Sequence, residues 1–408
     1  MSVHYDALET RPPEEREASL RECLAAQVAH AKARSAAYAR LLDGIEPGDV
    51  TGRDALARLP ITRKSDLMQA QAEAPPLGGF NATPLAQLAH VFASPGPIHE
   101  GQGEGRDPWR YARALHATGL RAGQLLHNTF AYHFTPAGFF FDAGARALGC
   151  PVFPAGPGQT EAQARAAAYL KPACYTGTPD FLKAILEAGD ALGLDLSSLR
   201  LGHVTAGAYL PSLRAWYRDR GLTVLQSYGT ADLGLIAYES EAREGLICHE
   251  GVVVEIVRPG TGDPVPEGEV GEVLVTTFDP HYPLIRFATG DLSAVLPGAS
   301  PCGRTNRRIR GWMGRADQAA KVRGMFVRPE QVAEVLRTHP EVTRARLVVT
   351  LAAERDEMTL RAEAPDPAIA EALSRTLQSV TRLRGAVEVV PPGTLPNDGK
   401  VVDDQRPA

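Results

Sequence analysis

The chain has 408 residues, of which 44% are hydrophobic and 22% are charged, and its formal net charge is −5. This length is long for one hydrophobic core, so we expect a soluble protein with two domains, one large and one small. The small negative charge excludes a general nucleic-acid or membrane-surface binder, so a polyanion would have to bind in a local pocket.

The five cysteines are scattered through the chain without a Cys-x-x-Cys pair. An odd number at wide spacing predicts free thiols in a reducing compartment rather than a disulfide framework. Residues 1–17 are acidic and lack an apolar signal core. The most apolar region, residues 137–152, contains Asp142 and Arg146 and is too short and too charged to span a bilayer. We therefore expect a cytoplasmic protein.

The first expected element is an amphipathic helix over residues 14–42, where apolar side chains recur at three- and four-residue spacing. Gly44, Pro47 and Gly48 would end this helix. Residues 59–67 are then typical of a capped helix start. Residues 92–105 contain four glycines and two prolines, so we expect a loop there.

From residue 108 onwards, helical and strand patterns alternate. The expected helices are 108–120, 138–148, 160–170 and 179–192, and the expected strands are 123–128, 151–153, 173–175, 203–205 and 223–225. This alternation predicts an α/β fold in which crossover helices connect parallel strands. Ligands of such sheets bind at the carboxyl ends of the strands. The polar loops at those ends are 127–135, 175–178, 206–209 and 228–232.

The remaining pattern predicts a β-ribbon and a second domain. Residues 251–257 and 269–277 alternate in character across a short Pro/Gly-rich connection, which indicates antiparallel strands. A compact α+β unit follows, with helices over 329–338 and 367–383 and strands over 345–351, 357–363 and 386–390. We therefore expect a large N-terminal domain of mixed sheets, residues 1–316, and a small mobile C-terminal domain, residues 317–408.

One turn carries the residue types of a nucleotide site. An apolar run at residues 222–225 leads into Tyr228-Gly229-Thr230-Ala231-Asp232. Such a turn places backbone N–H groups beside a ligand. Tyr228 could stack on a flat ring, Thr230 could donate to a phosphate oxygen, and Asp232 could bind Mg²⁺. An ordinary strand-to-loop turn is the alternative on these residues alone.

Three further motifs follow this turn in the sequence. Residues 282–292 contain Thr-Gly-Asp at 289–291, residues 314–318 are Gly-Arg-Ala-Asp-Gln, and residues 396–400 are Pro-Asn-Asp-Gly-Lys. In this order the four motifs resemble those of the adenylate-forming superfamily. The individual residues of these motifs, and those of the segment 59–67, are similar to the motifs of the phenylacetate–CoA ligase family. The resemblance extends from about residue 59 to residue 400.

The resemblance implies a role for each motif. Asp291 would accept hydrogen bonds from the ribose hydroxyls, and Arg315 would bind the ribose or a phosphate. Asp317 would be the hinge, and Lys400 would bring a positive charge to the reacting phosphate. A turn-capping Asp, a surface salt bridge and a solvated tail lysine are the alternatives for Asp291, Arg315 and Lys400.

The resemblance also assigns residues by position alone. The nucleotide would contact Ala206, Gly207 and Ala208 as well as Tyr228, Gly229 and Thr230; the acyl pocket would contain Tyr132, His133 and Phe134; and CoA would contact Arg323, Gly324 and Arg328. The alternatives are a tight strand exit for the first group, core aromatics for the acyl pocket, and an exposed basic strand end for the CoA contacts.

The segment at the position of the family's phosphate loop departs from its pattern. It offers Ser94 and Gly96 but no lysine, and Glu100 and Glu104 would repel phosphate. Its glycines could still wrap phosphates with backbone N–H groups. A mobile surface loop without phosphate contact is the alternative.

The sequence contains two candidate metal positions. At the first, Ala231 replaces the family's Ser or Thr, and Asp232 is one methylene shorter than the family's Glu, which alters the reach to Mg²⁺. At the second, Cys248, His249 and Cys302 lack the paired spacing of zinc ligands, so we expect no zinc site.

The resemblance implies an ATP-dependent carboxylic acid–CoA ligase, for an aromatic acid, that forms an acyl-adenylate and uses ATP, Mg²⁺ and CoA. Its partners would be these small molecules, without nucleic acid or membrane, and a homodimer is compatible with this class. Two alternatives remain open. The acyl group could pass to an amine or a carrier protein, or the chain could be a non-catalytic nucleotide- or acyl-CoA-binding homologue.

Overall fold

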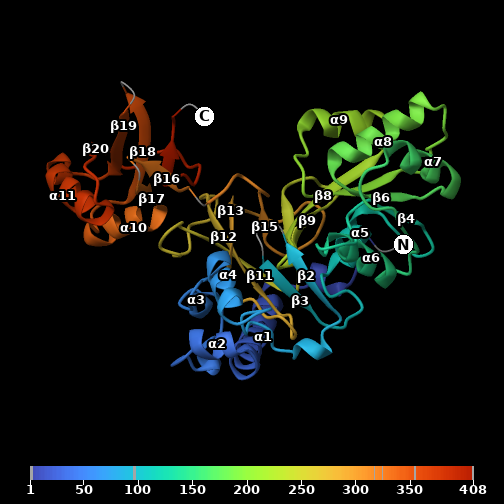
Figure 1. Cartoon of the computed structure of the whole chain (residues 1–408), viewed down its shortest axis with the longest axis horizontal. Coiled ribbons are helices and arrows are strands. Elements are labelled where there is room, and N and C mark those ends of the chain that lie inside the picture. Colours follow the sequence, from blue (N-terminus) through green and yellow to red (C-terminus); the bar gives the residue numbers. More distant parts are fainter. Residues whose placement is uncertain (1–2, 95–97, 317, 324, 353–354, 407–408) are drawn as a thin grey trace. The chain divides into compact units, whose positions relative to one another are not determined.

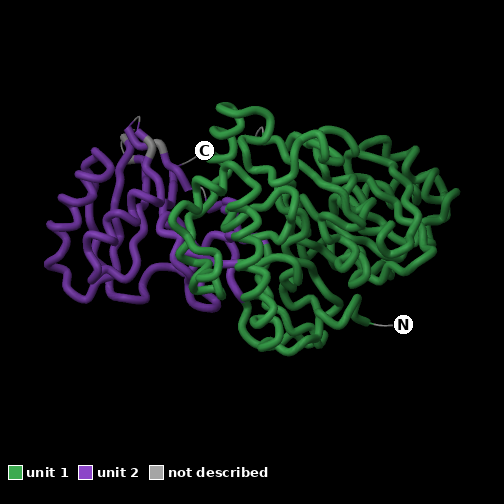
Figure 2. Tube along the Cα trace, turned by 90° about the horizontal axis from the view of Figure 1, so that it is seen from below, with its two compact units in different colours: residues 1–254, 275–287, 296–311 green, residues 255–274, 288–295, 312–408 purple. Residues whose placement is uncertain are grey.

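The structure is a computed structural model that describes residues 3–94, 98–316, 318–323, 325–352 and 355–406. The chain forms two compact units (Figure 2). Unit 1 comprises residues 1–254, 275–287 and 296–311, and unit 2 comprises residues 255–274, 288–295 and 312–408. The proposed boundary at residues 316/317 stays a prediction, since residue 317 is outside the described ranges and unit 2 includes two earlier segments.

Within unit 1, eight strands of one sheet lie in the order β15-β10-β9-β8-β7-β6-β4-β5. Their bounds are β4 Leu126–Asn128, β5 Val152–Pro154, β6 Cys174–Gly177, β7 Leu201–Val204, β8 Thr223–Thr230, β9 Gly234–Glu239, β10 Leu246–Cys248 and β15 Arg308–Ile309. The five strands from β5 to β8 in this order are parallel, as the alternating pattern predicts. The strands from β8 to β15 pair antiparallel. The predicted α/β class with mixed sheets is confirmed.

Five helices cover the parallel half of this sheet (Figure 1): α5 Tyr111–Thr118, α6 Ala137–Ala147, α7 Thr160–Leu170, α8 Pro179–Ala191 and α9 Pro211–Asp219. Helices α5 and α6 pack on one face, and α7 to α9 pack on the other. Neighbouring residues of β6 show why both faces are apolar. Cys174 packs into the core with α5 and α6, whereas Tyr175 points the other way into the core with α7 to α9.

The N-terminal region differs from the single helix expected over residues 14–42. Two helices, α1 Pro13–Arg34 and α2 Ala36–Leu41, meet at Ser35, which has an extended backbone. Ser35 ends α1 by donating its N–H to Ala31 O at 2.9 Å, and its side chain caps α2 by accepting from Tyr38 N at 3.3 Å. The other elements here are η1 Ala7–Thr10, η2 Pro47–Asp49, α3 Arg53–Leu56, β1 Thr62–Arg63, α4 Lys64–Glu73 and η3 Leu85–Gln87.

The capped helix start expected at residues 59–67 is confirmed, because Arg63 N donates to Asp66 Oδ2 at 2.8 Å at the first turn of α4. The loop expected over residues 92–105 is wrong for most of its length. A hairpin of β2 His90–Ser94 and β3 Ile98–Gln102 pairs Phe92 with Glu100, and residues 95–97 are outside the described ranges. Gly101 lies within β3, and a Cβ there would come within 2.8 Å of the Leu88 side chain. This glycine permits close packing rather than a turn.

The C-terminal elements of unit 2 are β16 Ala320–Val322, β17 Met325–Val327, α10 Pro329–Thr338, β18 Arg344–Ala352, β19 Arg355–Glu363, η4 Pro367–Ile369, α11 Ala370–Thr381, β20 Ala386–Val390 and β21 Val402–Asp404. The two predicted helices and three predicted strands correspond to α10, α11 with η4, β18, β19 and β20, whereas β16 and β17 were not predicted. Four strands form a sheet in the order β20-β19-β18-β21. Strand β21 was not predicted, and it pairs parallel to β18 with Leu347 opposite Val402. Val332 of α10, Leu373 of α11 and Leu360 of β19 share one buried core.

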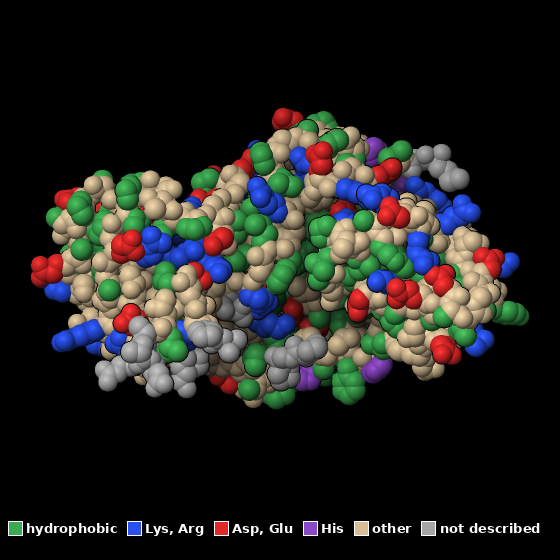
Figure 3. All heavy atoms as spheres, turned by 90° about the horizontal axis from the view of Figure 1, so that it is seen from above, with side chains coloured by type: hydrophobic (Ala, Val, Ile, Leu, Met, Phe, Trp, Pro, Cys, Tyr) green, Lys and Arg blue, Asp and Glu red, His purple; other side chains and the backbone are tan. Residues whose placement is uncertain are grey.

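Four strands are divided between the two units: β11 Val252–Val257, β12 Gly271–Thr277, β13 Phe287–Ser293 and β14 Val295–Leu296. Strands β11 and β12 occur where the β-ribbon was expected. No helix of the described residues combines the length and apolarity that crossing a bilayer requires. On the face drawn in Figure 3, basic and acidic side chains are interspersed.

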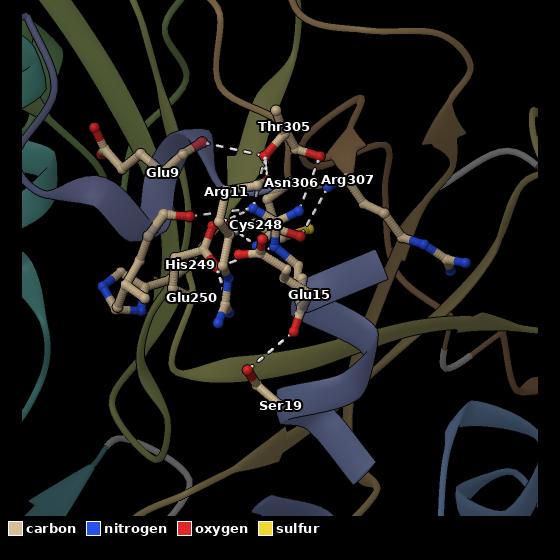
Figure 4. A network of polar contacts seen from close by, with 12 residues as sticks. Glu9, Arg11, Glu15, Ser19, Cys248, His249, Glu250, Thr305, Asn306 and Arg307 are labelled. Carbon is tan, nitrogen blue, oxygen red and sulfur yellow. Dashed lines mark hydrogen bonds and ion pairs between the residues drawn. The ribbon is translucent and has the colours of Figure 1, made fainter. Parts of the chain in front are cut away.

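A buried ionic network anchors the N-terminal segment of unit 1. Glu9 is 1% exposed and accepts a hydrogen bond from Tyr238 Oη at 2.6 Å. Its carboxylate also pairs with Arg304 at 3.2 Å and with Arg113 at 3.5 Å. The backbone N–H of Thr305 donates to Glu9 O at 2.9 Å (Figure 4). The segment before α1 is therefore tied to β9 and to the loop before β15.

We expect Glu9→Gln to destabilise unit 1 by about 3 kcal/mol, because removing one member of a buried ion pair leaves buried charge without compensation. Urea unfolding followed by circular dichroism measures the change. Glu15→Gln is the matched control, since Glu15 is exposed at the start of α1. Equal unfolding midpoints for the two variants would contradict the role given to Glu9.

Candidate active site

The predicted nucleotide turn lies at the carboxyl end of β8. Gly229 is required there because a Cβ would come within 2.5 Å of Gly234 O, and the pairing with β9 shifts between Tyr228 and Gly229. Tyr228 is buried. The Thr230 hydroxyl oxygen accepts the N–H of Leu233 at 3.2 Å. These contacts fix the turn and leave the Thr230 hydroxyl proton available for a phosphate oxygen.

Asp232 follows this turn with a buried carboxylate. Its Oδ2 lies 3.4 Å from Nζ of Lys64, the first residue of α4. Its Oδ1 is buried and has no hydrogen-bond partner within the part of the chain that the structure describes. An unpartnered carboxylate oxygen fits a hard cation such as Mg²⁺. This contact of Lys64 could not be expected from the sequence, although Lys64 lies in the segment 59–67 that resembles the family.

The hairpin β2–β3 carries a second buried carboxylate to the same place. Glu100 is 4% exposed, whereas Glu104 is exposed. Burial, together with the nearby charge of Asp232, raises the pKa of Glu100 well above its usual range. The predicted phosphate-loop residue Ser94 donates to Ile98 O at 3.4 Å across the hairpin. Gly96 lies outside the described residues.

The predicted adenine-contacting residues form an exposed loop after β7. Ala206 has a left-handed backbone with φ of 61°, which is strained for a residue with a Cβ. A Cβ on Gly207 would lie 3.0 Å from Pro179 Cδ, so only a small residue fits. Ala208 is exposed beside them. The loop has the expected place at a strand end, and its contact with adenine stays a prediction.

The three residues predicted to line the acyl pocket differ in their surroundings. The Tyr132 hydroxyl accepts from Asn128 Nδ2 at 2.7 Å, and its ring meets that of Phe139 edge to face at 5.5 Å. His133 is exposed, and Phe134 is 78% exposed. The structure therefore brings Tyr132 into an aromatic cluster and leaves His133 and Phe134 at the surface.

Asp291 and Arg315 lie together in unit 2. Arg315 Nη1 and Trp312 Nε1 both donate to Asp291 Oδ1, at 3.0 and 3.1 Å. Gly290 has φ of 73°, and a Cβ there would lie 2.7 Å from Arg315 Nη2, so glycine permits this approach. The sequence analysis did not identify Trp312, whose only signal was its position three residues before Arg315. The carboxylate expected to bind ribose is thus already hydrogen-bonded to two side chains.

Lys400 precedes β21, also in unit 2. Its Nζ pairs with Asp403 Oδ1 at 2.9 Å. Gln318 holds the loop by donating to Gly399 O at 2.9 Å and by accepting the N–H of Val402 at 3.0 Å. Lys400 and Arg315 line one cavity of about 270 Å³. Two of the predicted cations, Arg315 and Lys400, are therefore brought together although they lie 85 residues apart in the sequence.

The predicted CoA contacts and the hinge are placed only in part. Arg323 donates to the backbone oxygens of Asp356 and Arg384, each at 3.1 Å. Arg328 is exposed and begins α10. Asp317 and Gly324 lie outside the described residues. A role in CoA binding or rotation stays a prediction for all four positions.

Two of the three candidate zinc ligands, Cys248 and His249, are drawn in Figure 4. Burial raises the pKa of the Cys248 thiol to about 12, which disfavours the thiolate that zinc requires. His249 Nδ1 accepts the N–H of Gly251 at 2.9 Å, and Cys302 Sγ lies 3.1 Å from Ser300 Oγ. Among the described residues, no three His, Cys, Asp or Glu side chains gather as a metal site. The expectation of no zinc stays a prediction.

Known proteins are similar to this chain over nearly its whole length. Residues 112–278 match the AMP-binding enzyme family. A phenylacetate-coenzyme A ligase of Thermus thermophilus is 32% identical, over 97% of this chain and 96% of its own length. The ligase of the same name from Escherichia coli is 32% identical, over 82% of this chain and 78% of its own.

A solved structure supports the same fold. The 2-hydroxyisobutyryl-CoA ligase, solved in a postadenylation state, superposes with a TM-score of 0.74 and 24% identity, over 99% of this chain and 93% of its own. Because the identity with the two ligases above exceeds 30% over most of both chains, the relationship is one of family and not only of fold. The chain belongs to the phenylacetate–coenzyme A ligase family of AMP-binding enzymes and is an acid–thiol ligase.

Proposed function

We propose that this chain activates an aromatic carboxylic acid with ATP and transfers the acyl group to coenzyme A. The observation that carries the proposal is that Arg315 and Lys400 line one cavity, with the Asp291 carboxylate hydrogen-bonded to Arg315. An anion with a sugar attached, such as AMP, would match this set of two cations and one acceptor. The named activity of the relatives supports an aromatic acid.

In the first step, a carboxylate oxygen of the acid attacks the α-phosphorus of ATP, and the bond to the β-phosphate oxygen breaks. Pyrophosphate leaves, and the acyl-adenylate forms. Lys400 would leave Asp403 and stabilise the negative charge that develops on the α-phosphate. Thr230 would donate to a phosphate oxygen, and Asp232 would hold Mg²⁺. When bound, this ion neutralises phosphate charge and orients the leaving group.

In the second step, the CoA thiolate attacks the acyl carbonyl carbon, and AMP leaves with the electrons of the broken C–O bond. Arg323 and Arg328 would attract the phosphates of CoA. We propose that residues 317–408 rotate about Asp317 between the two steps. The 2-hydroxyisobutyryl-CoA ligase supports such a motion, because it has been solved in postadenylation, thioesterification and open states.

A reducing compartment such as the cytoplasm suits the proposal, since all five cysteines are free thiols. A homodimer stays a prediction, which light scattering would test.

The acidic hairpin favours one competing function, that of a non-catalytic nucleotide- or acyl-CoA-binding protein, because Glu100 stands where the family carries its phosphate loop.

ATP–pyrophosphate exchange across a panel of acids separates these functions. We expect phenylacetate or another arylacetic or benzoic acid to support exchange at least about tenfold better than acetate or hexanoate, because flat apolar walls favour an aromatic ring. Consumption of CoA, compared with hydroxylamine as the acyl acceptor, tests the second step. Exchange without CoA turnover would indicate an amine or carrier-protein acceptor, and no exchange with any acid would favour the non-catalytic function.

Lys400→Ala is expected to lower the exchange rate by about 100- to 1,000-fold, because a charge aimed at the reacting phosphate is lost. Lys183→Ala is the matched control, since Lys183 lies in α8 of unit 1, where it pairs with Glu187 and lies over the Trp216 ring. Circular dichroism checks that both variants are folded. An exchange rate that survives the Lys400 substitution would remove the role given to this side chain.

Trp312→Phe is expected to tighten AMP binding about fivefold, because the phenyl ring has no N–H to compete with ribose for Asp291 Oδ1 and one hydrogen bond is worth about 1 kcal/mol. Isothermal titration calorimetry measures the AMP affinity. Trp216→Phe, in α9, is the control, because Trp216 stacks against Arg220 in unit 1, whereas Asp291 and Trp312 belong to unit 2. Weaker AMP binding by the Trp312 variant alone would mean that the indole supports the nucleotide instead of competing with it.

A further inference from the structure

The strongest unexplained feature of unit 1 is a pair of buried carboxylates with unsatisfied oxygens. Glu100 is more than nine-tenths buried, and no well-formed hydrogen bond reaches its carboxylate oxygens among the described residues, although the Ser94 hydroxyl and the Asp232 carboxylate lie close enough to act on it. Oδ1 of Asp232 is also buried without a well-formed hydrogen bond among the described residues. A buried polar oxygen without a partner costs free energy, so three of them at one place indicate an absent ligand.

The two carboxylates face one cavity between β3, the turn after β8 and the loop before α5. Phe92, Glu100, Trp109, Arg110, Asp232 and Tyr282 are among the residues that line it. The space open to the centre of a water molecule is about 20 Å³, which is room for about one water molecule or one ion. The cavity therefore has the size of an ion-binding site and not of an organic ligand.

The charges around this cavity show which ion would fit. Lys64 pairs with Asp232 through Oδ2, on the side away from the unpartnered Oδ1. Arg110 donates to the carbonyl oxygens of Leu233 and Pro108. Asp279 also lines the cavity, so two cations, Lys64 and Arg110, stand against three carboxylates, which leaves one excess negative charge when all three acids are ionised. A small cation that prefers oxygen ligands would remove that excess.

We propose that Glu100 and Asp232 together hold a divalent cation, and that Glu100 supplies a ligand from the hairpin that stands in place of a lysine-bearing phosphate loop. The proposal deepens the proposed function, on which the identity of the cation as the Mg²⁺ of Mg·ATP rests. Magnesium sites commonly use one or two carboxylates and complete their shell with water and phosphate oxygens. This matches the absence of a third acidic, His or Cys ligand among the described residues.

The proposal explains how an acidic hairpin can serve a polyanion. Without a cation, Glu100 and Asp232 would repel triphosphate. Glu100 and Asp232 would hold a divalent cation that offsets their charge and offers positions to phosphate oxygens, in place of the lysine of the family's phosphate loop.

Binding of Mn²⁺ to the full-length protein, without ATP, tests the proposal. Electron paramagnetic resonance counts free Mn²⁺ during a titration, and magnesium competition checks that the site is not specific for manganese. We expect Glu100→Gln to weaken Mn²⁺ binding by at least about tenfold, since one charged ligand is lost. Glu104→Gln is the matched control, because Glu104 is exposed on the same segment. Equal affinities in the wild type and the Glu100 variant would overturn the proposal.

A stability measurement shows whether Glu100→Gln folds. In EDTA the variant should be at least as stable as the wild type, because Gln removes a buried acid that lies beside Asp232. A lower thermal midpoint for the variant would contradict the strain assigned to this pair.

The two proposals can fail separately. If Mn²⁺ binding depends on Glu100 but no acid supports ATP–pyrophosphate exchange, the cation site stands and the ligase function does not. If exchange is measurable and Mn²⁺ affinity is unchanged in the Glu100 variant, the ligase function stands and the cation site does not.

Discussion

Three ion pairs hold the charged candidate residues, one in unit 1 and two in unit 2: Asp232 with Lys64, Asp291 with Arg315, and Asp403 with Lys400. The acid is the buried member of each pair, with side-chain exposures of 2%, 11% and 10%, and the cations are exposed by 39%, 53% and 51%. The surroundings of a buried acid hold it in place. An exposed cation on a long side chain loses little interaction free energy when it moves away, because exposed ion pairs are weak. Ligand anions can therefore recruit the cations without disturbing the fold.

This arrangement explains how residues of a nucleotide site are held before a nucleotide arrives. Arg315 and Trp312 donate hydrogen bonds to Asp291, and Asp403 forms an ion pair with Lys400. Each contact satisfies a group that would otherwise be unpaired, and each can be exchanged for a contact with AMP or with a reacting phosphate. The buried pair of Glu100 and Asp232 differs because no cation of the described residues reaches Glu100 as an ion pair. That difference is the physical basis for a divalent cation at this place.

Most of the secondary structure could be predicted from periodicity, because the helices and parallel strands of residues 108–230 bury complete apolar faces. The predictions were wrong where a residue had two physical uses. Ser35 lies within a stretch of apolar periodicity, but it caps a second helix, so two helices form where one was expected. The glycines after Phe92 indicated a loop, but Gly101 lies in β3, where a Cβ would come within 2.8 Å of Leu88 Cδ1. Periodicity cannot distinguish a glycine chosen for a turn from one chosen for close packing.

The sequence alone determined the α/β class, the order of the motifs and the family, because four short motifs and a long alternating pattern need no knowledge of distant contacts. Only the tertiary structure decided which charges meet. Lys400 is placed by the pairing of β21 with β18, Lys64 reaches Asp232 across 168 residues, and Glu100 turns inward through the register of the hairpin. Each of these depends on a pairing between distant segments, and a one-residue shift in strand register would reverse the direction of the side chain.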